Sequence, residues 1–225
     1  MNPDRGHRQY KSAKKYGHYL TGRSLILRAY TLTMAMAGCL VAGCLTGGNL
    51  MADDATLVID DRSSGDYSSG AGSDWRLVTD TVMGGVSNGQ LTVEEINGRP
   101  CLRLRGEVRT ENNGGFIQAA LDLETPRVRD ASAFDGVLID VYGNGETYNL
   151  HLRQDGLWLP WQAFRASFTA PPEWQTHYLP FAQFQPHKTS ASLKRDRLKR
   201  IGVVAIGRAF TADLCIGRIG YYRVQ

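Results

Sequence analysis

The chain has 225 residues, of which 42% are hydrophobic, 21% charged and 9% aromatic. These proportions exclude a disordered polar chain and a polytopic membrane protein. The formal net charge is +4, but residues 1–28 hold seven of the 26 basic side chains and one of the 22 acidic ones, which leaves 19 basic against 21 acidic residues in the remainder. Because a nearly neutral body has no basic surface for phosphates, we expect no nucleic-acid partner.

The first part of the chain has the order of an export signal. Residues 29–52 carry no charge and directly follow the basic stretch. Val41-Ala42-Gly43-Cys44 resembles the lipobox of bacterial lipoproteins, in which the cysteine becomes the acylated first residue, and it follows a longer apolar run than the similar Met36-Ala37-Gly38-Cys39. We therefore expect a leader over residues 1–44, lipidation of Cys44, and a membrane-anchored or periplasmic body in the cell envelope. The alternatives are an uncleaved membrane anchor, ordinary signal cleavage near Ala52, and a mitochondrial transit peptide.

Two cysteines, Cys101 and Cys215, remain in the body, 114 positions apart. In an exported domain they can form a disulfide, which would stabilise the fold by about 4 kcal/mol through loop closure. Two separate buried thiols are the alternative. The cysteines and histidines match no zinc-ligand spacing, so we expect no metal site.

Residues 45–73 are rich in Ser, Gly and Asp and contain one apolar run, at 56–59. This composition predicts a flexible spacer with one short strand. We expect the folded domain over residues 74–225, because Trp75 is the first large aromatic residue after the spacer and residues 76–79 have the pattern of a strand.

The rest of the body has the pattern of an all-β domain. Short apolar or alternating runs predict further strands at 90–94, 101–104, 116–121, 137–142, 147–153, 161–168, 177–179, 201–206 and 216–224. Turn signals such as Asn97-Gly98 separate them. The charged segment Ser190–Arg200 is the one helical candidate. Eight or more short strands with such turns indicate a two-sheet β-sandwich of jelly-roll type.

The sequence has no recognisable catalytic motif. It lacks a P-loop, a Gly-x-Ser-x-Gly nucleophile elbow and a His-Glu-x-x-His zinc motif. Three isolated histidines are expected to have structural or surface roles: His151, His177 and His187. Three acids beside predicted turns could pair for glycoside hydrolysis, although acids are ordinary at such positions: Asp135, Asp140 and Glu146. We therefore expect a protein that is not an enzyme, with no catalytic residue and no cofactor.

Two segments combine a glycine pair with polar residues, namely Asp80–Ser87 and Glu111–Phe116. Glycine permits positive φ and close backbone approach, so Asp80, Ser87 and Asn113 can cap backbone groups at tight turns. Alternatively, the same polar groups converge on a ligand. The local chemistry favours the structural explanation and leaves the second one open.

These segments belong to a longer set of residues that follow one another in a fixed order. The set comprises Trp75, Asp80, Val82–Ser87, Asn112–Phe116, Phe134–Gly136, Gly143–Gly145 with Tyr148, Trp174, and Pro180-Phe181 with Phe184 and Pro186. From about Trp75 to Tyr222 the chain therefore resembles the complex I intermediate-associated protein family of the thirty-kilodalton type. The resemblance implies a galactose-binding-like jelly roll and a non-enzymatic role, since mitochondrial members assist the assembly of respiratory complex I. Asn144 departs from the family, where an Asp would stand between the two glycines.

Two hypotheses of function follow. The first is a lipid-anchored binding or assembly module that presents a loop surface to a protein partner. Assembly of complex I itself would require that the leader is not a lipoprotein signal, because that role works on the inner side of the membrane. The second hypothesis is a carbohydrate-binding module with Trp158 and Trp161 as aromatic platforms, whereas Trp75 and Trp174 are expected in the core.

For either hypothesis, the ligand-binding residues are expected where loops from different strands gather. The predicted set is Asp80, Ser87, Asn112, Asn113, Tyr148 and Arg153.

Overall fold

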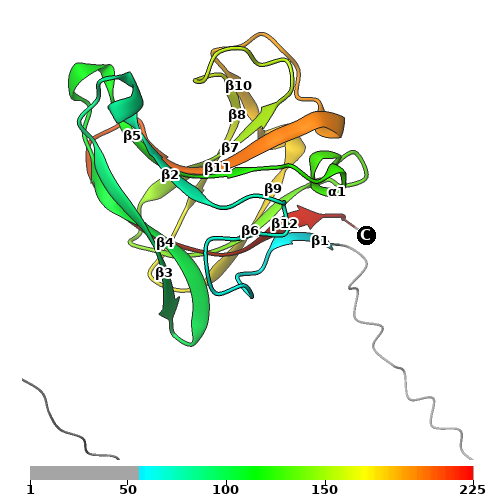
Figure 1. The fold of residues 1–225 in the computed structure, drawn as a ribbon, viewed down its shortest axis with the longest axis horizontal. Helices are drawn as coiled ribbons and strands as arrows, with labels where there is room; N and C mark the ends of the chain where they lie inside the picture. Colours follow the sequence, from blue (N-terminus) through cyan, green and yellow to red (C-terminus); the bar gives the residue numbers. More distant parts are fainter. Residues whose placement is uncertain (1–55, 225) are drawn as a thin grey trace, which may run out of the picture. The chain divides into compact units, whose positions relative to one another are not determined.

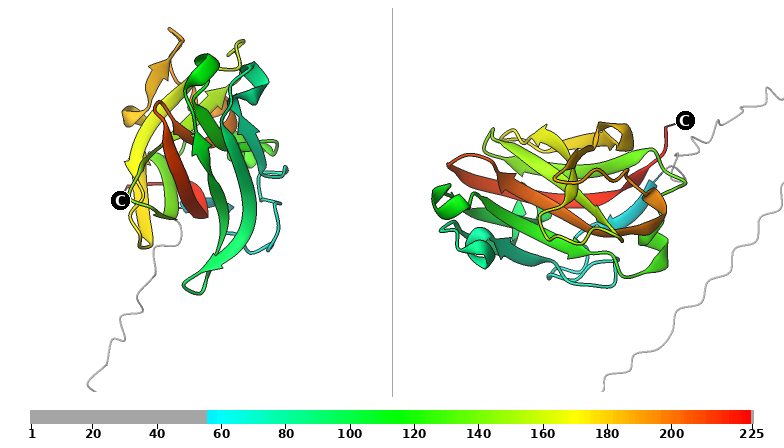
Figure 2. Two further views of the ribbon diagram at one scale, coloured as in Figure 1. Left: turned by 90° about the vertical axis from the view of Figure 1, so that its left-hand side faces the viewer. Right: turned by 90° about the horizontal axis from the view of Figure 1, so that it is seen from above.

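Twelve β-strands form two antiparallel sheets that pack face to face in the computed structural model, which describes residues 56–224 (Figure 1; Figure 2). The first sheet has the order β3 (Asn88–Ile96), β4 (Arg99–Val108), β12 (Phe210–Tyr222), β6 (Gly136–Gly143) and β9 (Gln175–Pro180), with β1 (Thr56–Asp60) beside β12. The second sheet has the order β10 (Gln185–His187), β8 (Ala163–Thr169), β7 (Thr147–Gln154), β11 (Leu198–Ile206), β5 (Phe116–Asp122) and β2 (Arg76–Thr79). The prediction of an all-β, two-sheet sandwich is confirmed.

Helical segments in the described part of the chain are single turns between strands. They are η2 (Asp80–Met83), η3 (Glu111–Asn113), α1 (Pro126–Arg129), η4 (Phe181–Gln183) and η5 (Arg195–Arg197). None of the helices within residues 56–224 has the length and apolar character needed to cross a membrane.

The core lies between the two sheets because side chains alternate along each strand. In β7, Leu150 and Leu152 are fully buried in the core, whereas His151 and Arg153 lie on the outer face of the second sheet. Each buried leucine stabilises the fold by about 2 kcal/mol through removal of apolar surface from water. The alternation seen in the sequence of β7 thus sets which of its side chains are available for a ligand.

The described part of the expected spacer packs onto the sandwich. Strand β1 pairs with β12, and the Asp60 carboxylate accepts hydrogen bonds from Trp75 Nε1 at 2.6 Å and from the Arg62 backbone N at 2.8 Å. Trp75 is buried, as predicted. The sandwich therefore includes β1. The expected leader and its Cys44 lie outside the described residues.

The helix predicted at Ser190–Arg200 is wrong. This segment contains the single turn η5 and then enters β11, where Leu198 is buried. The backbone of this segment bonds to the buried side chain of Gln154 and not to a helical turn. Gln154 accepts from Lys194 N at 2.6 Å and donates to Ser192 O at 3.1 Å. Tertiary contacts thus override a charge pattern that suited a helix surface.

The structure joins Cys101 on β4 to Cys215 on β12 in a disulfide, with a Cα–Cα distance of 5.4 Å. Both residues are buried. Of the two alternatives that the sequence left open, the disulfide is therefore the one observed. It connects two neighbouring strands of the first sheet across 114 residues of chain.

Candidate functional site

A groove of about 540 Å³ lies on the outer face of the second sheet. Every strand of this sheet contributes to its lining, from Val78 on β2 to His187 on β10. In Figure 1, the turns η2 and η3 stand at one end of this face and the loops around β10 at the other. The groove is therefore a product of the whole sheet and of the connections at its two ends.

Apolar side chains form two opposite rims of the groove. The η2 rim consists of Val82 and Met83, which are 72% and 50% exposed. The tryptophan rim consists of Pro160 and Trp161, and Trp161 is 44% exposed. Apolar side chains beside a groove with polar groups on its floor are typical of ligand-binding sites.

Arg153 holds the loop that carries the tryptophan rim. Its guanidinium donates to the carbonyl oxygens of Leu159 and Gln162, both at 2.9 Å, and to that of Pro160. The Gln162 side chain adds a bond from Leu159 N to its Oε1 at 3.1 Å. A single arginine on β7 thus orders a loop that has no secondary structure of its own.

The floor of the groove contains polar side chains in register across neighbouring strands. Arg165 on β8 lies opposite His151 on β7, and His151 lies opposite Gly202 on β11. A Cβ at position 202 would clash with the side-chain amide of Gln118, so glycine leaves room for this amide on the floor. Amide, imidazole and guanidinium groups are therefore presented together.

The groove is electropositive although the body of the protein is nearly neutral. Burial lowers the pKa of Arg153 and Arg165, and the neighbouring Arg200 lowers that of Arg153 further. Burial, followed by the charges of Arg165 and His187, lowers the pKa of His151 to about 3. Burial is the first cause of each shift, so these basic groups lie in a partly desolvated part of the groove.

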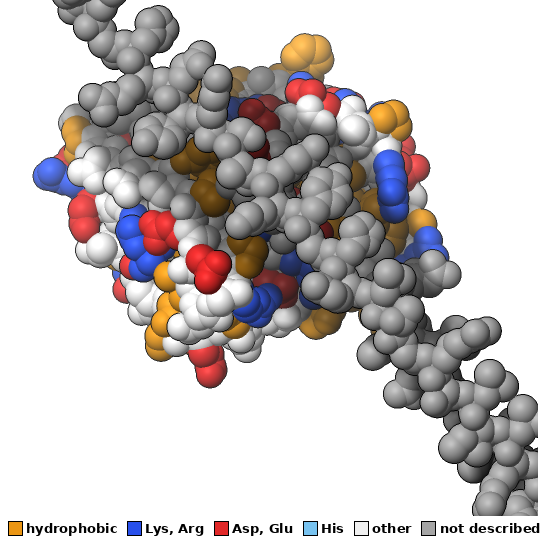
Figure 3. Space-filling model, turned by 60° about the horizontal axis from the view of Figure 1, so that its bottom comes forward, with side chains coloured by type: hydrophobic (Ala, Val, Ile, Leu, Met, Phe, Trp, Pro, Cys, Tyr) orange, Lys and Arg blue, Asp and Glu red, His pale blue; other side chains and the backbone are white. Residues whose placement is uncertain are grey.

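Charges on the outer face of the first sheet are arranged differently. Arg103 lies between Glu94 and Asp213, with nitrogen–oxygen distances of 3.0 and 2.6 Å, and Arg105 contacts Glu94 at 2.9 Å. In Figure 3, basic and acidic side chains lie beside one another on the face of the molecule seen from below. Paired surface charges of this kind are ordinary for a solvated sheet face.

Two residues of the predicted site, Asp80 and Ser87, form a buried structural cluster. The fully buried carboxylate of Asp80 accepts from Ser87 N at 3.0 Å, from Ser87 Oγ at 2.5 Å and from Gly115 N at 2.5 Å. Burial raises the pKa of Asp80, but the hydrogen bonds from Ser87 and Gly115 outweigh it and leave the pKa below its usual value. A Cβ at Gly114 would lie 2.5 Å from Asp80 Oδ2. The two glycine-pair segments therefore meet around this carboxylate, as the structural explanation proposed.

The structure does not bring the remaining predicted residues to one place. Tyr148 faces the core, where its hydroxyl donates to Asn144 Oδ1 at 2.7 Å and accepts from Asp213 N at 3.0 Å. Burial raises its pKa to about 12. Asn112 is exposed in η3 with a φ of 57°, and Asn113 follows it in the same turn. Of the six predicted residues, Arg153 is the one that lines the groove.

Sequence reasoning missed most of the floor of the groove. Single residues such as Arg165 and Gln118 carried no signal, and His151 was expected to have a structural or surface role. The carbohydrate-binding hypothesis named Trp161, which lies at the rim of the groove, together with Trp158. The missing signal was available in the alternation of β7 and β8, whose polar positions mark the outer face.

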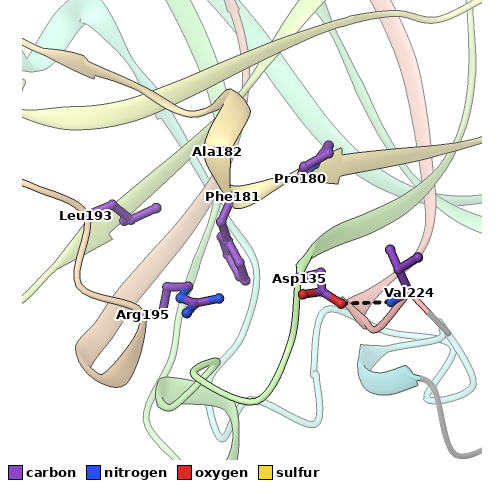
Figure 4. Close-up of a pocket in the computed structure, with 7 residues that line it drawn as sticks. All are labelled: Asp135, Pro180, Phe181, Ala182, Leu193, Arg195 and Val224. Carbon is purple, nitrogen blue, oxygen red and sulfur yellow. Dashed lines mark hydrogen bonds between the residues drawn. The ribbon is translucent and has the colours of Figure 1, made fainter.

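A second hollow, of about 710 Å³, lies where the chain enters β6 and β10 and is drawn in Figure 4. Its lining residues are Asp135, Pro180, Phe181, Ala182, Leu193, Arg195 and Val224. The Asp135 carboxylate accepts from Val224 N at 2.8 Å, and the Arg195 guanidinium donates to Phe134 O at 2.9 Å and lies over the Phe181 ring. Because these charged groups are engaged within the domain, the groove is the stronger candidate site.

The acids considered for glycoside hydrolysis each have partners of their own. Asp140 contacts Arg99 at 3.1 Å and Thr176 Oγ1 at 2.5 Å, and Glu146 pairs with Arg208. Across residues 56–224 the structure also has no group of three side chains suited to hold a metal ion.

Comparison with solved structures gives the same fold. The family 11 carbohydrate-binding module of the cellulosomal cellulase Lic26A-Cel5E of Clostridium thermocellum matches with a TM-score of 0.60 and 12% identity, covering 75% of this chain and 95% of the module. The Clostridium thermocellum family 11 module in complex with a β-1,3-1,4-mixed-linked tetrasaccharide matches with a TM-score of 0.59 and 13% identity, covering 76% and 96%. At this identity the likeness concerns the fold alone, and it agrees with the galactose-binding-like jelly roll that was expected.

No protein of curated function matches the sequence. The sequence pattern of complex I intermediate-associated protein 30 (CIA30) does match, over residues 64–215, which is more than half of the chain. The ordered motifs from Trp75 to Pro186, the glycine pairs around Asp80, the strands from β2 to β11 and the start of β12 fall within this range. The chain therefore belongs to the complex I intermediate-associated protein 30 family.

Proposed function

We propose that this protein is a non-enzymatic binding module, exported and anchored by a lipid on Cys44 in the cell envelope, whose groove holds a saccharide chain. The observation that carries the proposal is the groove itself, in which a polar floor lies between the η2 rim and the tryptophan rim. Saccharide sites combine an aromatic face for the apolar side of a sugar ring with hydrogen-bonding groups for its hydroxyls.

The groove supplies both elements. Trp161 is half-exposed at the rim, where its ring can stack against a sugar, and Gln118 and His151 supply polar atoms on the floor. The groove runs over all six strands of the second sheet, which suits an extended chain better than a single small molecule. The solved module of the same fold in complex with a tetrasaccharide supports this choice by analogy.

The disulfide of the domain supports the proposed export. The disulfide between Cys101 and Cys215 is typical of oxidising compartments and rare in the cytosol. Intact-mass spectrometry of protein recovered from membranes is expected to give a mature chain that begins at an acylated Cys44. An unprocessed chain, or one cut at another residue, would overturn the lipid anchor.

Binding of a protein partner is the second candidate function. It is favoured by membership of the CIA30 family and by the apolar rim residues Val82 and Met83, which a partner could cover. Under this alternative, tagged protein from membranes would enrich one specific partner, and substitution of Met83 by Ser would reduce that enrichment.

Two tryptophans on one loop give a matched test of saccharide binding. Trp161 lines the groove, whereas Trp158 is 91% exposed and lies outside its lining. On a glycan array, Trp161→Ala is expected to weaken binding about tenfold through loss of ring stacking, and Trp158→Ala to change it by less than about threefold. No binding across the array by the folded wild-type protein would overturn the saccharide proposal.

A further inference from the structure

Basic side chains in the proposed binding groove outnumber their acidic partners. Arg153, Arg165, Lys188 and Arg200 line the groove, and no Asp or Glu does so among the residues that the structure describes. Arg200 is neutralised by Asp122 just outside, with a nitrogen–oxygen distance of 2.5 Å. Within residues 56–224, the other three cations have no carboxylate in ion-pair contact.

Arg165 and His151 are the strongest sign of a missing partner. They are direct neighbours across β8 and β7 in the middle of the sheet. Arg165 Nε and His151 Nε2 are both shielded from solvent, and neither has a hydrogen-bond partner among the described residues. Burial of polar groups without partners costs free energy, and more so for a charged one. An anion that contacts the Arg165 guanidinium from the groove, which this side chain lines, would offset part of that cost.

The pKa shifts agree with this description. Burial lowers the pKa of Arg165, and burial, Arg165 and Lys188, in that order, lower the pKa of His187 at the end of the floor. The charges of Arg165 and Lys188 therefore repel a further positive charge on His187 in the free groove. A bound anion would relieve this repulsion.

The rims distinguish between classes of anion. A polyphosphate or a polyglutamate-like peptide would use the charged floor but has no apolar face to cover Trp161 and Met83, which are 44% and 50% exposed. A sugar ring with an acidic substituent presents an apolar face to the tryptophan rim and its anionic group to the floor. The combination of both features in one groove favours an acidic saccharide.

We propose that the groove selects an acidic saccharide chain, whose carboxylate or sulfate group binds Arg165 beside His151 while a sugar ring stacks on Trp161. This inference rests on the saccharide-binding function proposed above and adds the charge of the ligand to it.

Matched pairs of polysaccharides test the charge directly. Titration calorimetry of the full chain at fixed ionic strength would compare polygalacturonate with its methyl ester, and dextran sulfate with dextran. At least one acidic member is expected to bind about tenfold more tightly than its neutral counterpart, because a hydrogen bond to a charged group is worth that much. The pair that shows the difference identifies the anion as carboxylate or sulfate.

Substitutions test whether the difference in affinity between acidic and neutral polysaccharides arises at the floor of the groove. Arg165→Gln is expected to remove the tenfold preference for the acidic member. Arg99→Gln, which removes the same charge from the first sheet, is expected to preserve the preference. If Arg165→Gln does not fold, Lys188→Gln at the exposed end of the groove is expected to reduce the preference several-fold.

Three results would overturn proposals at different levels. Equal affinity for acidic and neutral members, with no effect of Arg165→Gln, would overturn the acidic ligand and leave saccharide binding intact. Binding of poly-L-glutamate as tight as that of the acidic polysaccharides would overturn the restriction to saccharides. No binding of any of the four polysaccharides, together with a silent glycan array, would overturn the proposed function itself.

Discussion

Asp80 is a buried carboxylate whose partners come from two other segments of the chain. It links the start of η2 to Ser87 and to the backbone N–H of Gly115. The sequence marked Asp80 as unusual, but its role depends on the approach of Gly114, which is 34 positions away and becomes its neighbour only in the folded sheet. This is why local chemistry left the capping and ligand-binding explanations side by side.

Substitution of Asp80 by Asn is expected to destabilise the fold by about 3 kcal/mol, because an amide nitrogen would face the N–H groups of Ser87 or Gly115 and leave a buried donor without an acceptor. The measurement is urea unfolding. Asp61→Asn is the control, since exposed Asp61 accepts only from nearby Ser63 and its loss should cost less than about 1 kcal/mol. Equal losses in the two variants would contradict a structural role for Asp80.

The turns η2 and η3 depend on their glycines for two different reasons. Gly84 has a φ of 86° and open space around its Cα, so Gly84→Ala strains only the backbone and should cost about 1 kcal/mol. At Gly114 a Cβ would collide with the Asp80 carboxylate, and Gly114→Ala should cost about 3 kcal/mol. Urea unfolding of both variants separates the two causes. A larger loss for Gly84→Ala would show that conformation rather than contact fixes these turns.

Strands were predictable where one side of the strand meets the core and the other meets solvent. The alternation of β4 and β7 has this origin. Strand β7 ends one residue later than predicted, whereas β4 extends two residues before and four residues after the predicted range 101–104. The helix predicted before β11 was wrong because the charged residues there lie on the surface of an irregular loop. The backbone of this loop is hydrogen-bonded to the side chain of Gln154. The edge strand β10 has three residues, with Pro186 in the middle. It is too short for an alternation of apolar and polar residues to be recognised in the sequence.

At the scale of the whole molecule, the groove could not be predicted from local pattern. Its lining extends from Val78 to Gly207 and combines residues of six strands with those of five connections. The nearly neutral net charge of the body also gave no sign of a groove lined by basic residues. Charges are paired on the first sheet but unevenly distributed on the second. Net charge excludes a broadly basic surface but says nothing about how charges divide between two faces.

The stability of the ligand-free protein is expected to fall as the pH is lowered from 7 to about 5. His151 has a folded-state pKa near 3 and an ordinary value of 6.5, so within that interval the unfolded chain binds a proton that the folded chain does not. Burial also lowers the pKa of His177 and His187, which act in the same direction. Asp80 does not contribute in this range, because its lowered pKa matters only below its ordinary value of 3.8. Melting temperatures should therefore decrease by several degrees in the wild type and by less in His151→Gln, with Arg99→Gln retaining the wild-type slope. An unchanged slope in His151→Gln would show that this imidazole is not held neutral by the groove.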